Sequence, residues 1–222
     1  MKVFVIPDVH FPWVDKKALK QIYKAIKHEK PNVVIQLGDL YDQYVFSKYD
    51  RDMNLITPEK EVKLAREMAT EFWATIHKIV PRARKIQLIG NHDVRIKKRV
   101  MEKLPELSCI LDVQQKLYSF PHVQVLKSDR DSIEIDGVVY THGWMTKLGD
   151  HMKYFGKSVV HGHSHRPGVA YEPKKNGFIF EMDVGHLADE KSTPLSYTNS
   201  KHSKWLKAYG IVEDGMPRLS II

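Results

Sequence analysis

The sequence has 222 residues, a formal net charge of +8 and a pI of about 9.3. Its one cysteine, Cys109, excludes an intramolecular disulfide, and no apolar run reaches the roughly 18–20 residues needed to span a bilayer. The hydrophobic fraction of 42% is ordinary for a globular protein, so we expect a single domain over residues 1–222, located in a reducing cytoplasm, with Cys109 as a small buried hydrophobe. The basic balance favours a polyanionic partner.

The first predicted unit is a strand, a helix and a second strand. Residues 2–6 form a short β-rich run that ends at Pro7, which is typical of a buried strand. Asp15 is placed to cap a helix whose apolar residues recur at helical spacing, and Pro31 ends that helix. Residues 32–37 follow as a second apolar strand.

A longer helix and a third strand come next. Thr57 is a favourable N-cap and Pro58 suits the first helical position, so a helix is expected to begin there. Its apolar stripe continues until Pro81 ends it, and residues 85–89 form the third strand. Alternating strands and helices predict parallel pairing through right-handed crossovers, with functional residues at the carboxyl ends of the strands.

The second half of the chain changes character. Short strands with little helix between them are expected at residues 131–135, 138–140, 158–160, 168–171, 178–182 and 207–212. Asp136 and Gly137 suit a two-residue hairpin turn between the first two of these strands. We therefore expect a second, more antiparallel sheet. The polar residues 189–204 are expected to be a surface loop or a mobile flap.

Five short polar motifs occur in one order along the chain, most of them directly after a predicted strand. They are Asp8-Val9-His10, Gly38-Asp39, Gly90-Asn91-His92-Asp93, Thr141-His142-Gly143 and Gly162-His163-Ser164-His165. Their carboxylate, imidazole and amide groups suit divalent transition metals and need no thiolate. The first two motifs are common by themselves, whereas Gly90-Asn91-His92-Asp93 and Gly162-His163-Ser164-His165 are rarer, and the order and spacing of the five are specific. From Asp8 to His165 the chain resembles the calcineurin-like metallophosphoesterase superfamily.

That resemblance implies an α/β fold, a four-layer α/β/β/α sandwich with two mixed β-sheets, and a site for two divalent cations. The implied ligands of the first ion are Asp8, His10, Asp39 and His165. The implied ligands of the second ion are Asp39, Asn91, His142 and His163. Asp39 bridges because a carboxylate offers two oxygens. His163 and His165 belong in a loop, because residues two apart do not share one side of a helix. We expect Mn²⁺, with iron, Zn²⁺ and Ni²⁺ as the alternatives.

The same resemblance implies a catalytic role for His92. The two ions lower the pKa of a bridging water, the resulting hydroxide attacks phosphorus, and the leaving oxygen needs a proton. His92 is the residue that the resemblance implies as the donor of that proton. Asp93 beside it is expected to orient the imidazole and to raise its pKa. A protein that kept the fold only for binding would have no need of His92, so we expect an enzyme.

The motifs do not select a substrate, because the same chemistry serves phosphodiesters, phosphomonoesters and nucleotides. Basic and aromatic residues near them suit phosphate contacts and base stacking. The candidates for substrate binding are Arg95, Lys97, Lys98, Tyr41, Trp13 and Trp144. They favour a phosphodiesterase or nuclease that acts on nucleic acid. A phosphomonoesterase, a nucleotide hydrolase or a small Ser/Thr-type protein phosphatase is the alternative, followed by a non-catalytic binding module. For the basic run itself, the alternative is an ordinary solvated helix face.

Seven histidines stand outside the five motifs. His161 directly precedes Gly162, and His186 directly follows Gly185, so both are close in sequence to the expected site or to a strand end. Neither is expected to bind a metal. We expect no membrane partner, and the sequence leaves the oligomeric state open.

Overall fold

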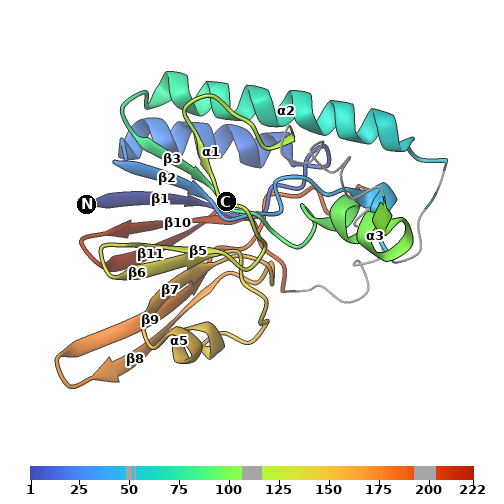
Figure 1. Cartoon of the computed structure of the whole chain (residues 1–222). Coiled ribbons are helices and arrows are strands. Elements are labelled where there is room, and N and C mark those ends of the chain that lie inside the picture. Colours follow the sequence, from blue (N-terminus) through green and yellow to red (C-terminus); the bar gives the residue numbers. More distant parts are fainter. Residues whose placement is uncertain (49–51, 53, 107–116, 193–203) are drawn as a thin grey trace.

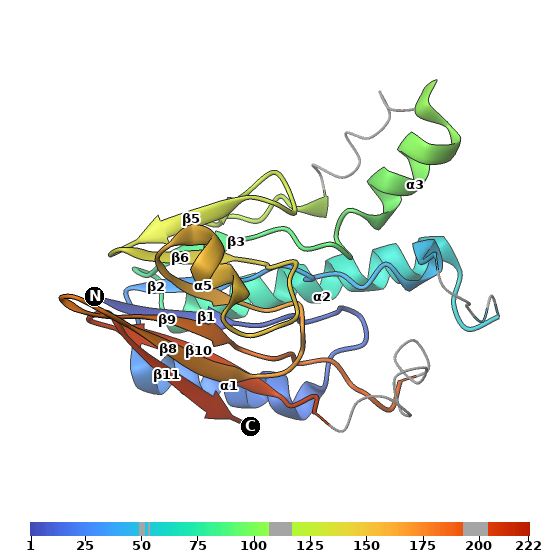
Figure 2. The ribbon, with the colours of Figure 1, turned by 90° about the horizontal axis from the view of Figure 1, so that it is seen from below.

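The computed structural model describes residues 1–48, 52, 54–106, 117–192 and 204–222. Two mixed β-sheets pack face to face, and helices cover their outer faces (Figure 1; Figure 2). This confirms the expected α/β/β/α sandwich with two mixed sheets. Cys109 and most of the expected loop at residues 189–204 lie outside the described residues.

The first sheet has six strands in the order β11-β10-β1-β2-β3-β4. Their bounds are β1 (Lys2–Ile6), β2 (Val33–Gln36), β3 (Arg84–Gln87), β4 (Gln124–Val125), β10 (Ala208–Glu213) and β11 (Met216–Ile221). Strands β1 to β4 pair in parallel, as the alternation of strands and helices predicts for the first three. Strand β10 runs antiparallel to β1, and β11 runs antiparallel to β10.

Helices α1 (Lys16–Glu29) and α2 (Pro58–Ile79) cover the outer face of this sheet (Figure 1). Asp15 caps α1 by accepting backbone N–H bonds from Lys17 and Ala18, and Thr57 caps α2 with Pro58 next to it. Both caps are those expected from the sequence. The apolar stripes of the two helices pack on the sheet in one buried cluster.

The second sheet has the order β5-β6-β7-β9-β8. Its strands are β5 (Ser132–Ile135), β6 (Val138–Thr141), β7 (Ser158–His161), β8 (Gly168–Lys174) and β9 (Gly177–Asp183). The three central strands are parallel, and an antiparallel strand flanks them on each side. Asp136 and Gly137, both at positive φ, form the expected hairpin turn between β5 and β6. The short helix α5 (Asp150–Phe155) lies against this sheet (Figure 1).

Buried apolar side chains fill the space between the sheets. Val5 and Ile35 from the first sheet pack in one cluster with Tyr140, Val160 and Phe180 from the second. Each is fully buried, and side chains on the inner faces of both sheets supply this core. Among the described helices, none is both long and apolar enough to cross a membrane.

The expected strand at residues 207–212 forms, but not in the second sheet. This segment is strand β10, which pairs with β1 in the first sheet. Backbone N–H and C=O groups pair with any strand edge that the fold places beside them, so composition alone does not select the sheet. Strands β4 and β11, the 3₁₀ turn η1 (Tyr44–Phe46) and helices α3 (Arg95–Lys103) and α5 were not predicted. No residue of α3 is fully buried, although Ile96 is partly buried against the core cluster beneath α1 and α2.

Candidate metal centre and catalytic site

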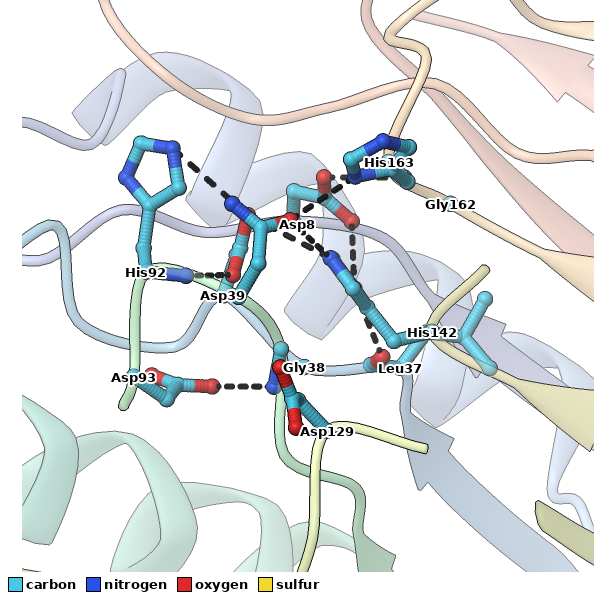
Figure 3. A network of polar contacts seen from close by, with 12 residues as sticks. Asp8, Leu37, Gly38, Asp39, His92, Asp93, Asp129, His142, Gly162 and His163 are labelled. Carbon is cyan, nitrogen blue, oxygen red and sulfur yellow. Dashed lines mark hydrogen bonds and ion pairs between the residues drawn. The ribbon is translucent and has the colours of Figure 1, made fainter. Parts of the chain in front are cut away.

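The candidate site lies where strands from both sheets end. Asp8, Asp39 and Asn91 follow β1, β2 and β3, and His142 and His163 follow β6 and β7. Figure 3 shows several of these side chains converging from separate loops. Parallel strands bring their carboxyl ends to one edge, so loops distant in sequence deliver polar groups to one place.

One group of close polar side chains comes from the first and last motifs. Nε2 of His165 lies 3.1 Å from Oδ2 of Asp8 and 3.2 Å from Nε2 of His10. All three residues are buried. These are three of the four residues expected to hold the first ion, and their atoms lie close enough together to bind one cation.

A second group surrounds the amide of Asn91. Its Oδ1 lies 2.9 Å from Nε2 of His142 and 2.8 Å from Nδ1 of His163. Oδ2 of Asp39 is 3.5 Å from Nε2 of His142. Ligand atoms of Asp8, Asp39 and His142 all lie within 4.8 Å of one another, so Asp39 stands between the two groups, where a bridging carboxylate is needed.

The donor atoms that converge in this site fit divalent cations. Nε2 of His10 and Nε2 of His165 face each other at 3.2 Å beside Oδ2 of Asp8, and a shared cation would hold all three. Oδ1 of Asp8, Nδ1 of His10 and Nδ1 of His165, which are not the converging atoms, are buried without a hydrogen-bond partner within the described part of the chain. Burial and the neighbouring Asp8 carboxylate raise the pKa of Asp39 well above its ordinary value, because two carboxylates buried together repel. A bound cation would offset that repulsion, and nitrogen and oxygen donors suit it.

The backbone of the site is held in an uncommon conformation. His10, Asp39, His163 and His165 have φ values of 58°, 48°, 71° and 61°. Residues other than glycine rarely adopt the left-handed region, and such strain concentrates at functional sites. The expectation that His163 and His165 lie in a loop is confirmed, and their left-handed turns aim both imidazoles into the site.

Two motif glycines make room for the carboxylates. A Cβ at Gly90 would overlap Oδ1 of Asp39, and a Cβ at Gly162 would overlap Oδ1 of Asp8. Any side chain at either position would displace an expected metal ligand. The physical reason for these glycines is close approach.

His92 is oriented by Asp42, which the sequence analysis did not identify. Nδ1 of His92 lies 2.6 Å from Oδ1 of Asp42. Arg95 completes the group, because its Nη2 lies 3.0 Å from Nε2 of His92 and its Nη1 donates to the carbonyl of Asp42 at 2.9 Å. Burial, followed by the Arg95 charge, lowers the pKa of His92 to about 3. Asp42 stands three residues after Asp39, and that spacing is its only local signal.

The role expected for Asp93 is therefore corrected. Its carboxylate is buried and accepts backbone N–H bonds from Gly90 at 2.8 Å and from Tyr41 at 2.9 Å. Asp93 thus ties the loop after β3 to the loop after β2, instead of orienting His92. Adjacent side chains in a turn point to different sides, so proximity to His92 in sequence did not place Asp93 against its ring.

The expected substrate-binding residues divide into two sets. Arg95 and Lys98 line a pocket of about 410 Å³ together with His92 and Asn91. Arg99, which follows them on α3, lines it too. Lys97 is exposed and does not line this pocket.

The expected aromatic residues are not at this pocket. Tyr41 is a core residue, 3% exposed, whose hydroxyl donates to the carbonyl of Leu117 at 2.7 Å. Trp13 lines a different pocket, beside Asp15. Trp144 packs against the ring of His151 at a centroid distance of 5.2 Å. Their expected role in base stacking at the metal site is thus not supported, because core packing and neighbouring loops already engage them.

His186 packs against the first group of expected ligands, at His165. Its ring stacks on that of His165, with centroids 4.8 Å apart, and its Nδ1 accepts the backbone N–H of Ala188. Trp205 also contacts His165, at a centroid distance of 4.3 Å. These contacts fix the plane of the His165 ring. His186 is not a member of the possible metal-binding groups found among the described residues.

The chain is similar to several known proteins. A family model for calcineurin-like phosphoesterases matches residues 1–177. Over 95% of its length the chain is 23% identical to the Gene 54 protein of Mycobacterium phage D29, of which 88% is covered. The structure is similar to Yfce, a phosphoesterase from E. coli, with a TM-score of 0.47, 18% identity and coverage of 100% of this chain and 97% of that one. It is also similar to Vps29 from Chaetomium thermophilum, with a TM-score of 0.46, 11% identity and coverage of 100% and 92%.

Proposed function

The chain belongs to the calcineurin-like phosphoesterase family and is a metal-dependent phosphoesterase, and from this premise we propose that its substrate is a phosphodiester of nucleic acid. The observation that carries the proposal is the basic pocket of about 410 Å³ that opens directly beside His92. A phosphodiester in a polymer brings further phosphates to either side of the one that reacts. Such a substrate needs cations next to the catalytic group, and this pocket supplies them.

One face of helix α3 provides most of the pocket's charge. Arg95, Lys98, Arg99 and Glu102 line the pocket, and their spacing of three and four residues places them on one side of a helix. Lys98 is held at 2.8 Å by Asp129, while Arg95 contacts His92. The cations therefore form a row that begins at the catalytic histidine and leads away from it along α3.

The lining of the pocket also includes an aromatic residue. Phe46, in the 3₁₀ turn η1, lines the pocket together with Ser47 and Lys48. An aromatic ring combined with a row of cations is what proteins use to hold single-stranded nucleic acid, because every base can stack and every phosphate is charged. Phe46 takes the stacking role that was expected of Tyr41 and Trp144.

The site residues have the following proposed roles. The first ion is held by Asp8, His10, Asp39 and His165, and the second by Asp39, Asn91, His142 and His163. When bound, the two cations, which we propose to be Mn²⁺, supply an activated water and neutralise charge on the phosphate. Asp42 holds Nδ1 of His92 and leaves Nε2 facing Arg95. When a phosphate oxygen of the substrate draws the Arg95 guanidinium away from Nε2, the charge that lowers the pKa of His92 is removed from the ring. The imidazole, held at Nδ1 by Asp42, then takes a second proton from solvent at Nε2 and passes that proton to the leaving oxygen.

The test compares two faces of helix α3. Lys98→Ala with Arg99→Ala should weaken binding of a labelled single-stranded oligonucleotide, measured by fluorescence anisotropy. The log–log dependence of affinity on salt should flatten by about 0.7 for each phosphate that the variant no longer neutralises. Lys97→Ala is the matched control, because Lys97 is exposed on the same helix and does not line the pocket. It should change neither quantity.

Small chromogenic esters separate the alternatives. With Mn²⁺ added, the protein should hydrolyse bis-p-nitrophenyl phosphate faster than p-nitrophenyl phosphate, and the Lys98→Ala/Arg99→Ala variant should match the wild type on both. If the variant keeps the wild-type affinity for the oligonucleotide and the wild-type dependence of that affinity on salt, the cations of α3 form a solvated helix face. The nucleic-acid proposal then fails. Preference for the monoester would point to a phosphomonoesterase or nucleotide hydrolase instead.

A further inference from the structure

A second polar cluster, distinct from the expected ligands, is buried behind the site. Glu181 on β9 is fully buried and lies between two imidazoles that are also buried, those of His151 and His161. Its Oε1 is 3.0 Å from Nε2 of His161 and 3.4 Å from Nδ1 of His151. Its Oε2 accepts the backbone N–H of Met152 at 2.7 Å. Neither Glu181 nor His151 belongs to the five sequence motifs.

The outer nitrogens of both imidazoles hold loop backbone. Nε2 of His151 accepts N–H bonds from Trp144 at 3.1 Å and from Met145 at 3.3 Å. Nδ1 of His161 donates to the carbonyl of Gly162 at 2.8 Å. Since Nε2 of His151 is an acceptor, its Nδ1 must carry the proton and donate to Glu181. One carboxylate on β9 is thus linked through two rings to two separate loops.

Those loops carry both imidazoles of the second expected ion, and the Gly162 loop also carries His165 of the first. Trp144 comes two residues after His142, and Gly162 directly precedes His163. The loops also bond to each other, because the N–H of Gly162 donates to the carbonyl of His142 at 3.0 Å. The rings of His142 and His163 meet Oδ1 of the same Asn91, as described above. The cluster therefore stands behind the second ligand group.

Gly143 shows how tightly this loop rests on the cluster. It has a φ of +97°, and a Cβ there would lie 3.2 Å from Nδ1 of His161 and 3.3 Å from Nε2 of His151. The backbone next to His142 is thus seated directly against both rings. A displacement of either ring would move the backbone that positions His142.

The cluster is closed by its own hydrogen bonds, unlike the metal site. The nitrogens of His151 and His161 and both carboxylate oxygens of Glu181 have partners, and none is among the unpartnered buried atoms of the described residues. A third metal ion would have to break these bonds. Burying a carboxylate and two imidazoles is also costly, since well-packed apolar residues often give equal or greater stability. What such a network provides is a fixed geometry.

We propose that Glu181 is a positioning residue for the second metal ion, acting through His151 and His161 on the loops that carry His142 and His163. The inference rests on the proposed two-ion site. The first ion's imidazoles have other support, because His165 stacks on His186 and His10 lies on the loop after β1. Loss of Glu181 should therefore lower the affinity for the two ions unequally, with the larger loss for the second ion.

The experiment uses Mn²⁺ as the probe and compares Glu181→Gln with Glu134→Gln. Glu134 is the matched control because it lies in the same sheet but is exposed, paired with Lys157 at 2.7 Å. Calorimetric titration of the metal-free proteins should give two sites in the wild type and the control. In Glu181→Gln one of the two sites should lose about 10–100-fold in affinity, the range for outer partners of metal ligands, while the other keeps its affinity.

Electron paramagnetic resonance gives an independent readout. With two equivalents of Mn²⁺, the wild type should show the spectrum of an exchange-coupled pair, and Glu181→Gln should show mainly an isolated ion. His151→Leu, which removes the acceptor for Trp144 and Met145, should reproduce this change. Circular dichroism and thermal unfolding of the metal-free proteins report whether the variants are folded.

The outcomes separate the two proposals. Absence of a coupled pair in the wild type would contradict the two-ion site itself. A coupled pair in the wild type that persists in both variants with unchanged affinities would overturn the role of Glu181 alone. Three other outcomes would also overturn it. Equal weakening of both ions would mean that the cluster supports the whole site. Loss of a third ion on substitution would mean that the cluster itself binds metal, and failure of both variants to fold would mean that it serves the fold.

Discussion

Oδ1 of Asp42 lies 2.6 Å from Nδ1 of His92, although the two residues are 50 positions apart in the chain. Both side chains are largely shielded, with 3% of Asp42 and 14% of His92 exposed. Burial raises the pKa of Asp42, but the neighbouring imidazoles of His10, at 3.6 Å, and of His92, at 2.6 Å, outweigh it and hold that pKa below its usual range. An ionised carboxylate therefore fixes the tautomer of His92 with the proton on Nδ1 and leaves Nε2 to face the pocket.

Replacing Asp42 by Asn should lower turnover by about 10²-fold, because the imidazole loses the partner that fixes its tautomer. Steady-state hydrolysis of a diester with an alkoxide leaving group measures this loss. Asp214→Asn is the control, since Asp214 is 82% exposed and pairs only with the chain's amino group among the ion pairs described. A variant with wild-type turnover on the alkoxide substrate would show that Asp42 does not act on the reaction.

Replacing His92 by Ala should cut turnover by about 10²–10⁴-fold with unchanged metal content. The loss should shrink for p-nitrophenol esters, because a good leaving group hardly needs a proton. Since Asp42 acts through His92, the double variant should be no slower than His92→Ala alone. Equal losses for alkoxide and p-nitrophenol leaving groups would argue against proton transfer by His92.

Removing the bridging carboxylate should affect both ions. Asp39→Asn is expected to bind Mn²⁺ weakly at both sites, because Asp39 stands between the two ligand groups. Elemental analysis after gel filtration measures the metal retained. A chelator should abolish wild-type activity, and Mn²⁺ should restore it. Two tightly held ions in Asp39→Asn would refute the bridging assignment.

The cap of helix α1 predicts a pH-dependent stability. Asp15 accepts N–H bonds from Lys17 at 2.8 Å and from Ala18 at 3.2 Å. Burial opposes ionisation, but these bonds and Lys207 leave its pKa below the ordinary 3.8. Its contribution is therefore present above pH 3.8 and lost as pH falls through the lower folded pKa.

Urea unfolding measures that contribution. The free energy of unfolding of Asp15→Ala should be about 1 kcal/mol lower than that of the wild type at pH 7. This difference in unfolding free energy should become smaller in acid. Asp15→Asn keeps a hydrogen-bond acceptor at the N-cap, so its free energy of unfolding at pH 7 should fall by only a few tenths of the loss in Asp15→Ala. Its own stability contribution should not change with pH in this range. A difference between wild type and Asp15→Ala that stays constant down to pH 3 would mean that the charge of Asp15 adds nothing.

The first three strands and the two long helices could be predicted because their signals are local. Apolar runs, helical spacing, the caps at Asp15 and Thr57 and the stops at Pro31 and Pro81 all act within a few residues. Sheet membership is not local. Strand β10 has the same composition whether it pairs with β1 or with a strand of the second sheet, and only the folded chain selects the edge.

The sequence by itself determined which residues could bind metal, because the chemistry of a ligand belongs to its side chain and the motifs follow strands that end at one edge. Only the tertiary structure decided what holds those residues. Asp93 is next to His92 in sequence but turns to the backbone of Gly90 and Tyr41, while the distant Asp42 reaches the ring. The physical reason is that hydrogen bonds follow distance and direction in space, and these depend on strand order and loop conformation, which no local pattern encodes.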